Sequence, residues 1–126
     1  MTTQIRTKRI YDPPEAADGY RVLSDRLWPR GMAKAVAAVD LWAKDVTPSD
    51  QLRRAYHGGE LTWDEFAGRY ETELADNPAW PGFVAEVSGA SVVTLLTAAK
   101  DVAHSHIPVL ARRLADADQR RARATS

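Results

Sequence analysis

Residues 90–97 read ASVVTLLT, a nearly continuous apolar run that is rich in β-branched side chains and follows the turn signal Ser88-Gly89. A strand that is buried on both faces has this composition, because other elements of the chain cover both sides of its sheet. Strands of this kind are typical of layered α/β proteins. The run therefore predicts a buried strand of an α/β fold.

Two further strands are predicted upstream of this run. Residues 4–11 alternate apolar and polar side chains and end at the breaker Pro13-Pro14. Residues 20–26 also have strand character, which stops before Pro29. The region 29–45 has no clear period, so we expect a short helix or an irregular loop there.

Capping signals mark the starts of the helices. Thr47 or Ser49 is a suitable N-cap for a helix that ends at residues 57–59, and Thr62 with Glu65 fits a capping box. Residues 83–87 predict a short helix, and Ser105 can cap a final one. The helix that begins after Thr62 carries apolar and aromatic side chains along one face. These are predicted to belong to the core rather than to a cofactor site, and they are Trp63, Phe66, Tyr70 and Leu74.

This order of elements predicts a compact single-domain α/β sandwich with a short, partly parallel sheet flanked by helices. The domain is expected to span residues 1–126, with an ordered core over about 4–118 and a frayed basic tail over 119–126. A chain of 126 residues is long enough for one hydrophobic core and too short for two.

The amino-acid composition limits the cellular compartment, the kinds of reactive group and the kind of ligand that we expect. The chain has no cysteine, so disulfides, thiolate nucleophiles and cysteine-based metal sites are excluded. No segment resembles a signal peptide or a membrane span, and we therefore expect a cytoplasmic protein with no membrane partner. The net charge is zero, but residues 1–34 and 91–126 carry an excess of cations, which suits an anionic ligand.

Two polar segments follow the predicted strands 20–26 and 90–97. Ligands of open α/β sheets collect at the carboxyl ends of the strands, so the two segments would share one cleft if these strands are neighbours. The cations there can hold a phosphate or carboxylate group. The predicted ligand-binding residues are Arg26, Trp28, Arg30, Lys34, Lys100 and Asp101.

Asp25 and His104 are the predicted catalytic residues, since a carboxylate and an imidazole can transfer protons near neutral pH. His106 is expected to be structural or solvent-facing. A metal site at Asp101, His104 and His106 has little support from their spacing, so no metal and no cofactor is predicted. For each residue taken singly, a structural ion pair is the commoner role.

Three functional readings remain open at this point. The first is an enzyme, or a remnant of one, that binds a small anionic or phosphorylated ligand. The second is a nucleic-acid-associated or regulatory module that uses the basic residues at 112–113 and 120–123. In the third, the polar residues serve the fold alone. No GxGxxG, Walker A, GxSxG or HExxH motif is present to favour a familiar enzyme, and a monomer and a homodimer are both compatible with the sequence.

Four segments resemble the YeaO-like branch of a bacterial family of unknown function, DUF488. They are RVLSDRLWPRG at 21–31, WAKDVTPSDQLR at 42–53, EFAGRYETEL at 65–74 and TLLTAAKD at 94–101. The resemblance extends from about Ile5 to Leu114. It implies a compact α/β fold and a cytoplasmic setting in bacteria or archaea, and no established activity.

The family's signature positions include several of the polar residues already singled out. This chain departs from the pattern at Thr97, where relatives often have Tyr, and at Ser105, where they often have Asn. More distant relatives carry a Cys-His pair at the start of the final helix, of which only His104 is present here. The matching signature positions are Asp25, Arg26, Trp28, Pro29, Arg30, Gly31, Lys34, Trp42, Lys44, Pro48, Ser49, Leu52, Arg53, Tyr70, Glu73, Leu74, Lys100, Asp101 and His104.

Overall fold

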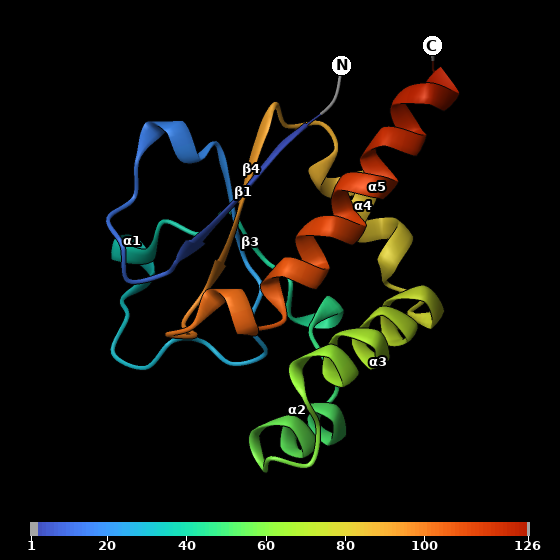
Figure 1. Ribbon diagram of the computed structural model, residues 1–126. Coiled ribbons are helices and arrows are strands. Elements are labelled where there is room, and N and C mark those ends of the chain that lie inside the picture. The colour runs from blue at the N-terminus through green and yellow to red at the C-terminus, as the bar shows by residue number, and fades with distance from the viewer. Residues whose placement is uncertain (1–2, 126) are drawn as a thin grey trace.

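A four-stranded sheet runs through the middle of the computed structural model, which describes residues 3–125 (Figure 1). The strand order is β1-β4-β2-β3, and every pairing is parallel. The predicted α/β class is confirmed, with a sheet that is wholly rather than partly parallel. The strands are β1 (Gln4–Arg9), β2 (Tyr20–Leu23), β3 (Leu41–Trp42) and β4 (Val92–Thr97).

Helices α2 to α5 pack against one face of this sheet, and α1 with the loops around it covers the other (Figure 1). Three short 3₁₀ turns join the elements: η1 (Ala16–Asp18), η2 (Lys44–Val46) and η3 (Val102–His104). The helices are α1 (Lys34–Ala37), α2 (Asp50–His57), α3 (Trp63–Asp76), α4 (Trp80–Val87) and α5 (Ile107–Thr125).

Strand β4 is buried on both faces, as its apolar sequence predicts. Val93 and Leu95 join the larger core beneath α2 to α5, and Leu96 joins a smaller core beneath α1. All three side chains are fully buried. The two-sided burial explains why this run has no polar alternation.

The capping predictions are confirmed by hydrogen bonds. The Ser49 hydroxyl accepts from the backbone N–H of Leu52 at the start of α2. Thr62 and Glu65 form the reciprocal bonds of a capping box at the start of α3. Ser105 Oγ accepts from the N–H of Ile107, the first residue of α5. These bonds satisfy backbone donors that have no partner inside a helix.

Two regions differ from the sequence-based expectation. The region 29–45 contains the short helix α1, but it also contains β3, which the sequence pattern did not predict. Helix α5 continues through 119–125, where a frayed tail was expected; Ser126 and residues 1–2 lie outside the described part of the chain. Within residues 3–125, no helix has both the length and the apolar character needed to cross a bilayer.

Candidate functional site

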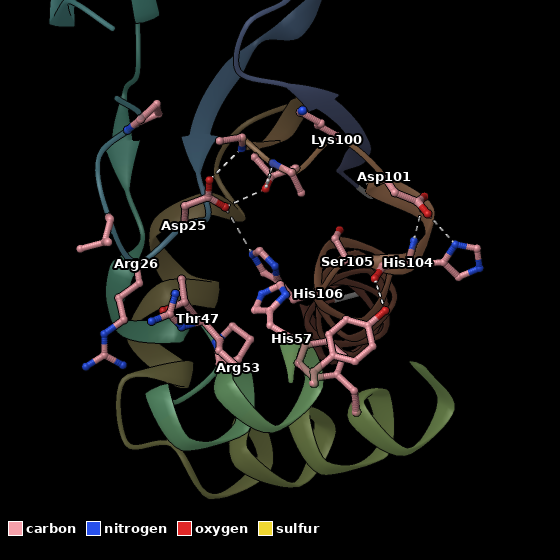
Figure 2. Close-up of a pocket in the computed structure, with 18 of the residues that line it drawn as sticks. Asp25, Arg26, Thr47, Arg53, His57, Lys100, Asp101, His104, Ser105 and His106 are labelled. Atoms are coloured by element: carbon pink, nitrogen blue, oxygen red, sulfur yellow. Dashed lines mark hydrogen bonds and ion pairs between the residues drawn. The ribbon is translucent and has the colours of Figure 1, made fainter. Parts of the chain in front are cut away.

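The carboxyl ends of β2 and β4 lie side by side, because these strands are parallel neighbours and Leu23 is in register with Leu96. The loops that follow them meet α2 and the start of α5 around a cavity of about 880 Å³ (Figure 2). The two polar segments identified from the sequence therefore do share one cleft. The acidic, basic and histidine side chains that line it are Asp25, Arg26, Arg30, Arg53, His57, Lys100, Asp101, His104 and His106.

Asp25 lies at the floor of this cavity, where it joins the two strand ends. Its carboxylate accepts hydrogen bonds from the Thr97 hydroxyl and the Ala98 backbone N–H, each at 2.7 Å. Its own carbonyl accepts a bond of 2.8 Å from the indole N–H of Trp42. The carboxylate is thus fixed in position, with both oxygens engaged.

His106 is the imidazole that faces Asp25 (Figure 2). Its side chain is only 15% exposed, its Nε2 lies 3.6 Å from Asp25 Oδ1, and the same nitrogen bonds the Ser24 carbonyl. Burial lowers the pKa of His106, because an imidazolium loses hydration inside the protein. The neighbour of Asp25 is therefore not the histidine predicted as its catalytic partner.

His104 lies at the rim of the cavity and points away from Asp25 (Figure 2). Its side chain is 64% exposed, and its Nδ1 is 2.8 Å from Asp101 Oδ2. The hydrogen bond with His104 lowers the pKa of Asp101. The backbone carbonyl of His104 accepts from the Tyr56 hydroxyl, which ties the rim to α2. The predicted pair of Asp25 and His104 is thus split between floor and rim.

The cations of the site fall into two groups. Arg26 and Arg53 both contact Asp50, at 3.5 Å and 2.6 Å, and the pKa of this carboxyl is lowered, mainly by its bond with Arg53. Arg30 and Lys100 make no side-chain ion pair or hydrogen bond with any residue in the described range 3–125. Arg26 and Lys100 lie on opposite sides of the His106 ring (Figure 2).

Two predicted ligand contacts have other positions. Lys34 is the first residue of α1 and is not among the residues that line the cavity. Trp28 does line it, but its indole N–H donates to the Met32 carbonyl at 2.7 Å, and its ring packs edge-on against Trp42 and onto the smaller core. Trp28 therefore anchors the loop that carries Arg26 and Arg30.

Helix α2 supplies the part of the site that sequence reasoning did not assign. Arg53, Tyr56 and His57 line the cavity from this helix, and the preceding Thr47 lines it as well. The Nε atom of Arg53 is buried and has no hydrogen-bond partner. Arg53 is one of the family's signature positions, and this was the one signal that could have drawn attention to it.

The hydroxyl groups around the cavity are all engaged in holding the fold. Thr97 donates to Asp25, and Thr47 donates to the Lys44 carbonyl at 2.7 Å. Ser105 donates to the Val102 carbonyl, also at 2.7 Å, besides capping α5. Across residues 3–125, no cluster of three His, Cys, Asp or Glu side chains is arranged to hold a metal ion.

Comparison with known proteins places the chain in a family. A family model described as "Inactive DUF488-N3 subclade" matches residues 4–126. The chain is 44% identical to the uncharacterized protein YeaO of Escherichia coli (strain K12) over 107 residues, which are 85% of this chain and 93% of YeaO. It is 46% identical to the uncharacterized protein Rv3073c of Mycobacterium tuberculosis (strain H37Rv) over 112 residues, which cover 89% and 94% of the two chains.

The uncharacterized protein Mb3100c of Mycobacterium bovis matches with the same identity and coverage. No solved structure matches the chain. The alignments cover nearly the full length of these relatives, and the family model covers the whole of the sheet and all five helices. The chain is therefore a YeaO-like member of the DUF488 family.

Proposed function

We propose that this protein binds a small anionic or phosphorylated ligand in the cavity at the carboxyl ends of β2 and β4. The observation that carries the proposal is the imbalance of charge in the cavity wall. Four cationic side chains line it, against the two carboxylates Asp25 and Asp101, and one carboxylate outside the lining, Asp50, pairs with Arg26 and Arg53. An anion would restore the balance in a partly enclosed site, where charge interactions are stronger than in water.

The bonding of these groups supports the same conclusion. Asp25 and Asp101 bond Thr97, Ala98 and His104 and form no ion pair with the four cations among the described residues. Arg30 and Lys100 have no partner among the described residues, and the buried Nε of Arg53 lacks an acceptor. An oxyanion is the acceptor that a guanidinium prefers. Arg26, Arg30, Arg53 and Lys100 are the proposed ligand-binding residues.

Binding without turnover is the role favoured by the chemistry of the wall. Every hydroxyl that lines the cavity within the described residues donates to a carbonyl or carboxylate of the protein, and the chain has no cysteine. A nucleophilic hydroxyl needs a general base as the acceptor of its proton. Thr47, Tyr56 and Ser105 donate instead to backbone carbonyls, and Thr97, which donates to Asp25, also accepts from the Ala99 N–H. The description of the family as an inactive subclade agrees with this reading. Catalytic roles for Asp25 and His104 stay predictions.

The proposal is tested by thermal shift with sulfate, inorganic phosphate, nucleoside monophosphates and short duplex DNA, because a ligand that binds the native state raises its stability. The paired substitution Arg30→Gln with Lys100→Gln removes two cations that hold nothing else in the described fold. Lys34→Gln is the matched control, since it removes a surface cation outside the cavity. We expect small anions to stabilise the wild type and the control, and the double variant to lose most of the shift.

Two results would overturn the proposal. One is the absence of any shift with small anions in the wild type. The other is a shift of equal size in the wild type and the double variant, because the anion would then bind elsewhere. A response to DNA alone, falling steeply with added salt, would favour the nucleic-acid reading instead.

A further inference from the structure

The imidazole of His106 is enclosed by groups from three sides of the cavity. From the loop after β2 it faces the Ser24 carbonyl and the Asp25 carboxylate, and from α2 it faces Arg53 and His57. From α3, the ring of Tyr70 meets it edge-on at 6.1 Å. Figure 2 shows the rings of His106 and His57 close together at the centre of the site.

The contact with Ser24 determines which nitrogen of His106 carries the proton in the free protein. A backbone carbonyl can only accept, so Nε2 must donate to it. The neutral ring then has its lone pair on Nδ1, and a proton taken from solvent is added there. The resulting imidazolium would keep its bond to Ser24 and lie 3.6 Å from the Asp25 carboxylate.

Two opposing influences act on that proton. Burial, the Arg53 guanidinium and the neighbouring His57 disfavour the imidazolium, whereas Asp25 and the Ser24 carbonyl favour it. An anion in the cavity would lie among the same cations that repel the proton. It would offset their repulsion and add its own attraction, so the neutral ring of the empty site would accept a proton when the site is filled.

We propose that the cavity takes up one proton on Nδ1 of His106 when an oxyanion binds, so that the site holds an anion more tightly in mildly acidic than in neutral solution. The inference rests on the proposed function, because it concerns the same cavity. Linkage requires that the anion and the proton strengthen each other's binding by the same factor. Uptake of one full proton gives about a tenfold gain in affinity for each unit of pH.

The test is isothermal titration calorimetry with sulfate, which does not itself titrate over the range from about pH 5.5 to pH 8 in which histidine changes charge. Repeating the titration in buffers with different ionisation enthalpies counts the protons taken up. We expect an uptake approaching one proton in the wild type near neutral pH. His106→Gln keeps an N–H donor for Ser24 but cannot titrate, and we expect it to bind sulfate with no proton uptake.

The variant His57→Gln shows which of the two imidazoles takes up the proton, because proton uptake should persist in it if His106 is the acceptor. Nitrogen NMR of the labelled wild type provides a measurement that needs no variant. It should show a neutral His106 ring protonated on Nε2, whose titration moves to higher pH when sulfate is added.

Sulfate binding with the same affinity at all pH values and no proton uptake would overturn this inference while leaving the anion site intact. Loss of proton uptake in His57→Gln, with uptake kept in His106→Gln, would also overturn it. Failure of sulfate and phosphate to bind at any pH would overturn the proposed function together with the inference.

Discussion

Tyr70 shows how a single buried residue supports the site from below. Its side chain is fully buried, and its hydroxyl donates a bond of 2.6 Å to the Val46 carbonyl, in the turn that leads into α2. Burial raises the pKa of Tyr70 well above its usual value, so the hydroxyl stays protonated and remains a donor. Its ring also meets His106 edge-on.

We therefore expect Tyr70→Phe to lower the free energy of unfolding by about 1–2 kcal/mol, because a buried carbonyl loses its donor. Tyr20→Phe is the matched control, since its hydroxyl bonds the exposed side chain of Glu86, and it should cost less than about 0.5 kcal/mol. Urea denaturation measures both. Equal losses in the two variants would show that the Val46 bond adds no stability of its own.

The sequence predicted some individual residues of the site and could not predict others. Asp25 was found because it follows a recognisable strand, and a carboxyl strand end is where parallel sheets present ligands. The choice between His104 and His106 depends on the 3₁₀ turn at Val102–His104, which turns the first ring outward and leaves the second against the floor. No periodicity in the sequence encodes that turn.

Gly19 connects the 3₁₀ turn η1 to strand β2 and fixes how this strand begins beside β4. Its φ is +62°, and a Cβ added there would lie 2.4 Å from the Val92 carbonyl oxygen. Val92 is the first residue of β4, so the contact is between two strand starts and cannot be relieved by a side-chain rotation. Glycine is required here by both conformation and space.

Gly19→Ala is thus expected to destabilise the protein by more than about 3 kcal/mol, since strain and a backbone clash add. Gly59→Ala provides the comparison, because that position also has a positive φ, of +80°, but nothing lies within 4 Å of the added methyl. It should cost only about 1–2 kcal/mol. The melting temperatures of the two variants measure these losses of stability. Losses of similar size would mean that the starts of β2 and β4 move apart easily.

Helices and strands whose sequence signals are short-range could be predicted, whereas an element held by contacts distant in sequence could not. The capping box at Thr62 and the cap at Ser49 are short-range patterns, and both were read correctly. Strand β3 was not, because its two residues carry no period of their own. It is held by bonds to β2 that are distant in sequence, from the Asp40 N–H to the Arg21 carbonyl and from the Ala43 N–H to the Leu23 carbonyl.

Across the whole molecule, buried titratable groups make stability depend on pH at two places. His106 lies in the cavity, and Asp18 lies on the opposite side of the sheet from α2–α5, fully buried, with its carboxylate 2.5 Å from Arg21 and 3.1 Å from Lys8. Burial alone would raise the pKa of Asp18, but hydrogen bonds from the Glu15 backbone, Lys8 and Arg21 outweigh it and lower the pKa.

The signs for the two groups follow from linkage. The pKa of His106 is lowered from its ordinary value of 6.5, so the unfolded chain binds a proton below that value while the folded protein resists it. Stability is therefore present above about pH 6.5 and falls as the pH drops. Asp18 has an ordinary value of 3.8 and stays ionised below it when folded, so its contribution is present above about pH 4 and is lost in stronger acid.

In chloride solutions free of sulfate and phosphate, the free energy of unfolding should thus decline in two steps, one below about pH 6.5 and one below about pH 4, each with a slope of at most ~1.4 kcal/mol per pH unit for one group. His106→Gln should flatten the upper step alone. Asp18→Asn should reduce the slope of the lower step alone, to which exposed carboxyls with lowered pKa values, Asp50 and Asp101 among them, also contribute. Slopes are compared rather than absolute stabilities, because Asp18→Asn also leaves Arg21 and Lys8 without their buried partner. Urea denaturation at a series of pH values measures them. An upper step that persists unchanged in His106→Gln would mean that another titrating group produces it, and that folding does not lower the pKa of the buried imidazole.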